Sequence, residues 1–224
     1  MGVDACAIVK FTKKIASLNP REFVETYLVK TLQAYEVVVG SDFHFGKNRE
    51  GDVHLLQELG KLYGFRVAIV PPLMKRRHKI SSTTIRNLVN KGRLKEIKNL
   101  LGRSFSLLGK VQRGDGRGRK IGFPTANINI SCDETLLRGV YIVEIVIDGK
   151  IFQGMANVGH RPSFSGMRKK INVEVHIFGF KRNIYGQEIE IRFLKRIRDE
   201  KRFSSIRQLV EQLKKDEQAA KKFF

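Results

Sequence analysis

A β-hairpin pattern in the second half of the chain constrains the fold more than any other feature. Asp148-Gly149 lies between two apolar runs rich in β-branched residues, and an Asp-Gly pair tolerates the positive φ angles of a tight turn. The runs of strand type cover residues 140–147, 151–156, 173–178 and 188–193. Antiparallel strands at such close spacing predict a small closed barrel that begins at about Ser106.

A helix pattern follows these strands. Ser205 stands three residues before Gln208, as in a capping box. Apolar residues then recur at helical spacing and would form one face: Ile206, Leu209, Val210 and Leu213. We therefore expect a C-terminal helix that closes the barrel domain.

The first hundred residues follow another pattern, in which apolar runs of strand length alternate with helix signals. Asn19 and Glu22 form a capping box around Pro20, and a second helix pattern covers residues 53–63. The expected strands cover residues 7–9, 36–40 and 66–70. Strands that alternate with helices through short links imply a parallel sheet covered by helices, so this part is of the α/β class.

A glycine-rich stretch lies near the start of the barrel pattern. Gly114, Gly116 and Gly118 alternate with charged residues, among them Arg117 and Arg119. A backbone without β-carbons can wrap a phosphate chain and point its N–H groups at it, while guanidinium groups supply charge and paired donors. The same composition is also typical of a solvent-exposed hairpin loop, and the stretch contains no P-loop pattern.

Two polar residues follow a proline a few positions later. Pro124 precedes Thr125 and Asn127, whose side chains would project to the same side of an extended chain. Two neutral oxygens can share a hard cation without cancelling its charge, which suits Mg²⁺ bound to nucleotide phosphates. The alternative is an ordinary turn that leads into a strand.

Composition narrows the class of protein. The chain is 42% hydrophobic, but no apolar run approaches membrane-spanning length and the N-terminus lacks a signal-peptide pattern. Cys6 and Cys132 are interpreted as reduced, packed thiols of a cytoplasmic protein.

The net charge of +21 would attract phosphorylated substrates, and nucleic acids without sequence preference. No nucleic-acid-binding motif is recognisable, so we expect neither a specific nucleic-acid partner nor a membrane partner.

Six motifs, in order from about Gly102 to the C-terminus, resemble those of the riboflavin kinase module. They are GRGRKIGFPTANI at 116–128, GVYIVEI at 139–145, GMANVGHRPSF at 154–164, VEVHIF at 173–178, IYG at 184–186 and RDEKRF at 198–203. The resemblance implies a six-stranded antiparallel Greek-key barrel with a C-terminal helix. It also implies transfer of the ATP γ-phosphate to the ribityl 5′-hydroxyl of riboflavin, which gives FMN.

The resemblance assigns roles to particular residues. Glu174 matches the glutamate that accepts the proton of the ribityl hydroxyl, whereas a strand glutamate without such a role would be a solvated charge. Thr125 and Asn127 would hold Mg²⁺, and the 114–119 loop would wrap the ATP phosphates. An apolar slot for the flavin would draw on the C-terminal helix and on Phe164, Ile184 and Tyr185, for which core packing is the alternative.

The segment before Gly102 resembles the back half of the FMN adenylyltransferase domain that precedes this module in bacterial bifunctional riboflavin kinase/FAD synthetase. We expect an incomplete, Rossmann-like nucleotidyltransferase domain at 1–102 and a riboflavin kinase domain at 103–224. The vestigial nucleotide-binding residues would be Ser81, Ser82 and Arg86, or Ser81 is simply a helix N-cap. The family's His-x-Gly-His motif is absent from the sequence, so FAD synthesis is expected to be lost.

Two alternatives stay open at the level of sequence. The chain could be a fragment of a complete bifunctional enzyme, with Met1 as an internal methionine. It could also be a flavin- or RNA-binding regulator without catalysis, which the charge of +21 allows and the intact Thr125, Asn127 and Glu174 disfavour. The oligomeric state leaves no signature in the sequence.

Overall fold

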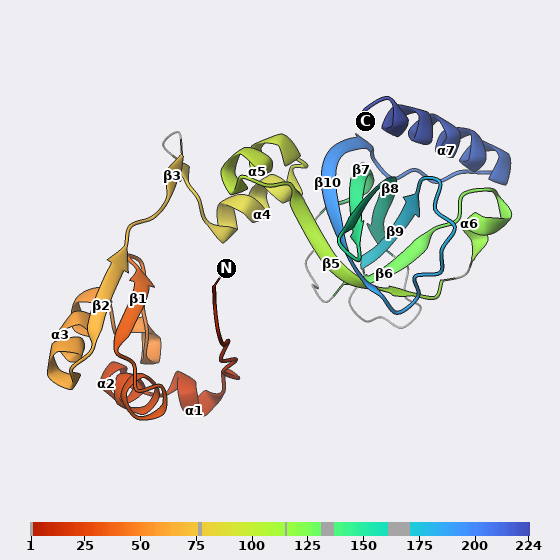
Figure 1. The fold of residues 1–224 in the computed structure, drawn as a ribbon. Coiled ribbons are helices and arrows are strands. Elements are labelled where there is room, and N and C mark those ends of the chain that lie inside the picture. The colour runs from red at the N-terminus through yellow and green to blue at the C-terminus, as the bar shows by residue number, and fades with distance from the viewer. Residues whose placement is uncertain (1, 76–77, 115, 131–136, 161–170) are drawn as a thin grey trace. The chain divides into compact units, whose positions relative to one another are not determined.

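The structure is a computed structural model, and it describes residues 2–75, 78–114, 116–130, 137–160 and 171–224. The chain divides into two compact units, Met1–Lys79 and Ile80–Phe224, whose elements are labelled in Figure 1. Each unit has its own cluster of buried apolar side chains. The two units are therefore treated one at a time.

The first unit contains a two-stranded parallel sheet, in which β1 (Glu36–Gly40) pairs with β2 (Arg66–Val70) and α3 (Val53–Tyr63) connects them. The other elements are α1 (Lys13–Ala16), α2 (Pro20–Phe23), the π-helix η1 (Val24–Thr31), the 3₁₀ turn η2 (Lys47–Arg49) and a small hairpin of β3 (Met74–Lys75) with β4 (His78–Lys79). The predicted capping box is present, because Asn19 Oδ1 accepts from the Glu22 amide at 2.9 Å and Glu22 Oε2 accepts from the Asn19 amide at 3.0 Å.

The predicted strand at residues 7–9 is wrong. Residues 2–12 form no regular structure, and the Ile8 side chain is 92% exposed. A three-residue run keeps strand conformation only when it pairs with another strand, and residues 7–9 pair with none of the described strands. Cys6, which we expected to be packed in the interior, is exposed for the same reason.

The core of the first unit is small, so one truncation in it should have a large effect. It consists of Val24, Phe45, Leu56, Leu59 and Phe65. Replacing Leu56 by alanine is expected to lower the free energy of unfolding of this unit by about 2–5 kcal/mol. Amide hydrogen exchange should show faster exchange in α3 and β2 while the barrel keeps its protection. Leu62→Ala, at an exposed position of the same helix, is the matched control. If Leu56→Ala lowered the protection of backbone amides equally in both units, the conclusion that each unit has its own core would be contradicted.

The second unit is a closed barrel of six antiparallel strands. They are β5 (Phe105–Gln112), β6 (Ala126–Ile130), β7 (Gly139–Ile147), β8 (Lys150–His160), β9 (Ile171–Ile177) and β10 (Glu188–Arg198), in the spatial order β10-β5-β6-β9-β8-β7. Strands β7, β8 and β9 form a meander and β10 returns to pair with β7, which is a Greek key. The predicted six-stranded Greek-key barrel is confirmed.

The turn between β7 and β8 has the conformation that its sequence predicts. Asp148 has a φ of 49° and Gly149 a φ of 74°, and the strands pair from Ile147↔Lys150 onward. A turn with two positive φ angles matches the twist of the strands that it joins. The hairpin places Val143, Ile145 and Ile147 in the barrel interior.

Two helices that precede the barrel pack on it. These are α4 (Ser82–Asn90) and α5 (Leu94–Leu101), and their buried residues Val89, Leu94 and Ile97 belong to the core cluster of the barrel. The compact units consequently divide after Lys79, earlier than the boundary at residue 102 that the sequence suggested. Amphipathic helices pack on whichever apolar surface they meet, and local sequence does not specify that surface.

The C-terminal helix α7 (Ile206–Lys221) forms as predicted. Ser205 Oγ accepts from the Gln208 amide at 3.3 Å, while the Gln208 side chain accepts from Ser204 Oγ at 2.9 Å. Ile206, expected on the packed face, is 69% exposed. It is the first residue of the helix, and the half-buried face begins one turn later at Leu209.

Candidate active site

The barrel unit contains a cavity of about 460 Å³. Its lining comes from the loop and short helix after β5, from strands β6, β7, β8 and β9, from the chain between the end of β10 and α7, and from α7. The part formed by the strands and the glycine loop includes Thr125, Asn127 and Glu174 together with apolar side chains such as Phe123 and Met155, and the charged residues Glu200 and Lys201 lie on the segment before α7. The part formed with α7 includes the apolar side chains Phe203, Leu209 and Leu213.

The glycine-rich loop packs so closely on β6 and on the segment before it that two of its glycines have no room for a side chain. A β-carbon on Gly114 would lie 2.0 Å from Asn127 Nδ2, and one on Gly118 would lie 2.2 Å from the Phe123 carbonyl oxygen. The loop runs into the short helix α6 (Arg117–Lys120), and the Phe123 amide donates to the Gly118 carbonyl at 2.9 Å. The loop is thereby fixed beside Thr125 and beside β6, which begins at Ala126 and carries Asn127.

Three neighbouring strands place polar residues in one row. Glu174 on β9 is directly opposite Asn127 on β6 and Asn157 on β8, and all three line the cavity. Asn172 Nδ2 donates to Glu174 Oε1 at 2.8 Å. One half-buried carboxylate therefore stands between two amide side chains, with a third amide fixing its orientation.

His176 supports the turn before β6. It is buried, and its Nδ1 donates to the Pro124 carbonyl at 2.7 Å. Its ring also packs at 5.4 Å from the Phe123 ring. The bond fixes the backbone directly before Thr125, and His176 itself lines the cavity.

Most of the predicted phosphate-binding and catalytic residues line this cavity, and two of them, Gly114 and Arg119, do not. Gly116, Arg117, Gly118, Thr125, Asn127 and Glu174 line it, and Gly114 adjoins Asn127. Arg119 is exposed and lies outside the lining.

Of the three residues proposed for the flavin, Ile184 and Tyr185 do not line the cavity. Ile184 is buried in the barrel core. Tyr185 is half exposed, and the guanidinium carbon of Arg113 lies 5.8 Å from the centroid of its ring. Phe164 lies outside the described residues. Ser81 is the N-cap of α4, where its Oγ accepts from the Thr84 amide at 3.2 Å, and Ser82 and Arg86 belong to the same helix.

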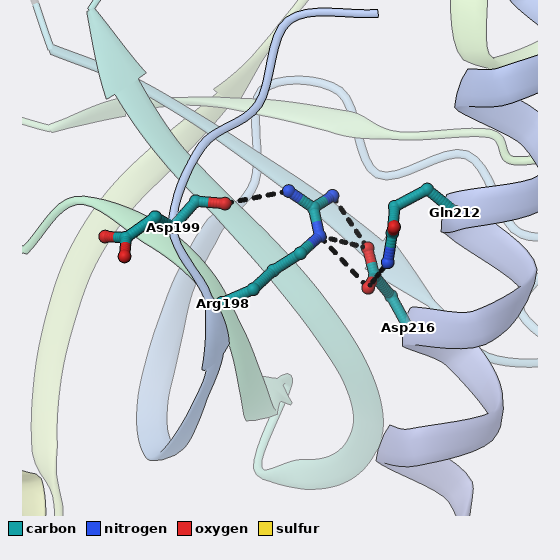
Figure 2. A network of polar contacts seen from close by, with 4 residues as sticks. All are labelled: Arg198, Asp199, Gln212 and Asp216. Carbon is teal, nitrogen blue, oxygen red and sulfur yellow. Dashed lines mark hydrogen bonds and ion pairs between the residues drawn. The ribbon is translucent and has the colours of Figure 1, made fainter.

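Sequence reasoning did not single out several lining residues. They are Asn172 on β9 and, within the 198–203 motif that was given no site role, Arg198, Glu200, Lys201 and Phe203. The C-terminal helix, which was expected to contribute to the flavin slot, lines the cavity with Leu209 and Leu213. Asn172 could have been found from strand alternation, because it shares a face with Glu174. At the start of the 198–203 segment, Arg198 forms an ion pair with Asp216 of α7, shown in Figure 2. Nothing local in the sequence indicates that pairing.

The oxygen donors of the cavity determine what cation it could hold. The described residues contain no group of three or more His, Cys, Asp or Glu side chains arranged to bind a metal ion. The cavity offers instead a hydroxyl, amide oxygens and the carboxylates of Glu174 and Glu200. These are hard ligands, which suit Mg²⁺ better than a soft transition metal.

Comparison with protein families gives two matches. The riboflavin kinase family model matches residues 101–224, which include the whole barrel, α7 and the cavity. The chain belongs to the riboflavin kinase family. The FAD synthetase family model matches residues 1–84, which cover the first unit and the start of α4. The order of the two matches agrees with the two parts expected from the sequence.

Relatives of full bifunctional type match almost the whole chain. The bifunctional riboflavin kinase/FMN adenylyltransferase of Buchnera aphidicola from Schizaphis graminum is 39% identical over 224 residues, which cover 99% of this chain and 72% of the relative. The protein of the same description from Escherichia coli K12 is 38% identical over 224 residues, which cover 100% of this chain and 71% of that protein. The riboflavin kinase domain therefore makes this chain an enzyme that uses riboflavin and ATP.

A solved structure shares the fold. It is described as a macrolide-efflux protein from Streptococcus pneumoniae, is 38% identical, and superposes with a TM-score of 0.76 over 94% of this chain and 67% of that one. The macrolide-efflux description is that of the solved protein, and the present chain shares its fold. In the described part of the present chain, no helix has the length and apolar character needed to cross a membrane.

Proposed function

We propose that Glu174 is the base of the riboflavin kinase reaction in this chain, and that the ATP phosphates bind between the glycine loop and β6. The observation that carries this proposal is the row Asn127–Glu174–Asn157 in a cavity bordered by Gly116 and Gly118. An alcohol is a weak nucleophile, so a carboxylate that takes its proton as the bond to phosphorus forms accelerates the transfer. The bond from Asn172 holds the carboxylate in one orientation for that step.

The remaining requirement of phosphoryl transfer is positioning and neutralisation of charge. The backbone N–H groups of the glycine loop and the Arg117 guanidinium would bind phosphate oxygens. Thr125 and Asn127 fit Mg²⁺, because their oxygens are hard donors and Gly114 leaves room for the Asn127 amide. A bound Mg²⁺ would neutralise charge on the phosphates. The lack of an acidic cluster in the described residues fits a cation that arrives with ATP.

Replacement of Asn127 by alanine tests this arrangement. It removes one oxygen donor while Thr125 and Glu174 remain, so kcat/KM for ATP should fall by about 10- to 100-fold. The Mg²⁺ concentration that gives half-maximal rate should rise. The control is Asn129→Ala, two residues later on the same strand, at an exposed position outside the cavity lining. An unchanged Mg²⁺ requirement in Asn127→Ala would remove Asn127 from the metal site.

We also propose that this chain does not adenylylate FMN. The proposal is supported by the absence of His-x-Gly-His from its sequence and by a sheet of only two parallel strands in the described first unit. Two labelling reactions separate the activities. γ-labelled ATP with riboflavin should give labelled FMN, and α-labelled ATP with FMN should give no labelled FAD. Labelled FAD would overturn the second proposal and leave the first intact.

The small-molecule substrates are proposed as the relevant partners, rather than RNA, and the cytoplasm as the site of action. The net charge of +21 would produce RNA binding that weakens steeply with salt, because it depends on release of counterions. We therefore expect RNA binding to disappear at moderate ionic strength. Binding that persists there without flavin, in a protein that forms no FMN, would favour a regulator instead.

A further inference from the structure

An ion pair with additional hydrogen bonds fastens α7 to the barrel (Figure 2). The Asp216 side chain on α7 is 2% exposed, and the Arg198 side chain at the end of β10 is 14% exposed. Arg198 Nε donates to both carboxylate oxygens of Asp216, at 3.1 and 2.9 Å, and Nη2 donates to Oδ2 at 2.7 Å. Gln212 Nε2, one helical turn earlier, donates to Oδ1 at 2.8 Å. The carboxylate is thus both charge-paired and fully hydrogen-bonded.

The other side of the same guanidinium fixes the segment that leads to α7. Arg198 Nη1 donates to the Asp199 carbonyl at 2.9 Å, and the guanidinium carbon lies 5.8 Å from the centroid of the Phe203 ring. Arg198 and Phe203 both line the cavity, whereas Asp216 does not. Arg198 therefore links a cavity wall to a buried acid outside the cavity.

The position of the apolar wall depends on this link. Leu209 and Leu213 of α7 complete the cavity together with Phe203. They lie one or two turns before Asp216 on a single helix, so any shift of α7 at Asp216 moves them as well. The groups proposed to bind ATP lie on other elements, which are the glycine loop, α6 and β6.

We propose that Asp216 is a positioning residue for riboflavin: through Arg198 it sets the place of α7 and hence the width of the apolar part of the cavity. This inference rests on the proposed function of the cavity. It requires that an apolar ring system lies against α7, while the phosphates lie against the glycine loop. Loss of the pair should weaken riboflavin binding and leave ATP binding nearly unchanged.

Asp216→Asn tests the proposal, because asparagine keeps the shape of the side chain and removes its charge. The riboflavin Kd, measured from flavin fluorescence, and the riboflavin KM should rise at least about tenfold, since a buried pair is disrupted and small displacements in a site have large effects. The KM for ATP should stay within about twofold of the wild-type value, because the groups proposed to bind ATP lie on other elements and separate sites respond independently. Glu211→Gln on the same helix breaks the exposed pair with Arg207 and is the matched control. It should change neither constant.

A milder variant keeps the test decisive where Asp216→Asn does not fold. Gln212→Ala removes one hydrogen bond from the carboxylate and should raise the riboflavin Kd in the same direction by a smaller factor. A folded variant with an unchanged riboflavin Kd, or with equal losses of riboflavin and ATP binding, would overturn the inference. Wild-type protein that binds riboflavin but forms no FMN would instead contradict the proposed function, and the binding constants would still decide the role of Asp216.

Discussion

Replacement of Glu174 by glutamine is expected to lower kcat for FMN formation by about 10²- to 10⁴-fold, the usual contribution of a positioned general base. Glutamine has nearly the same size and can still accept from Asn172, so the row of polar side chains across β6, β9 and β8 should keep its geometry. The amide cannot accept the proton of the ribityl hydroxyl. The KM values for ATP and riboflavin should therefore change little.

Steady-state rates of FMN formation measure this effect directly. Glu188→Gln is the appropriate control, because Glu188 is an exposed strand glutamate of β10 that does not line the cavity. It should retain full activity. A Glu174→Gln variant with a normal kcat would show that another group takes the proton, and the assignment of the base would be wrong.

Gly118→Ala is expected to reduce kcat/KM for ATP by about 100-fold, because small displacements of positioning groups have effects of this size. Its β-carbon would lie 2.2 Å from the Phe123 carbonyl oxygen and 3.3 Å from Thr125 Oγ1. The first of these neighbours is backbone, which cannot turn away as a side chain can. Relief of the clash would separate the glycine loop from the segment that leads to Thr125, and so weaken the hydrogen bond from the Phe123 amide to Gly118.

The control for Gly118→Ala is Gly149→Ala in the hairpin turn. Gly149 has a φ of 74° and open space where its β-carbon would lie, so alanine there costs about 1 kcal/mol of stability through the backbone alone. It should leave the ATP constants unchanged. ATP kinetics that are equally impaired in both variants would mean that general destabilisation, rather than the loop, explains the result for Gly118.

Features with a local cause could be predicted from the sequence. The Asp148-Gly149 turn, the capping box at Asn19 and the N-caps at Ser81 and Ser205 depend on residues within three positions of one another. The six strands follow from alternation and turn signals, and their Greek-key order came from the resemblance to riboflavin kinases. The shared lining of Gly116, Thr125 and Glu174 could also be anticipated, because the motifs that contain them are distinctive.

Features that depend on tertiary pairing could not be predicted. The Arg198–Asp216 pair joins residues 18 positions apart on different elements, and only the folded chain shows that it connects the end of β10 to α7. The packing of α4 and α5 on the barrel has the same origin. Residues 7–9 had the composition of a strand but pair with none of the described strands, so composition alone gave the wrong result.

The most direct test of the account is a time course with purified protein, riboflavin, ATP and Mg²⁺, in which riboflavin, FMN and FAD are separated by chromatography. We predict that FMN accumulates in step with loss of riboflavin, that FAD stays absent, and that Glu174→Gln forms FMN at a small fraction of the wild-type rate. Absence of FMN from folded wild-type protein under these conditions would contradict the assignment of the cavity as a riboflavin kinase site.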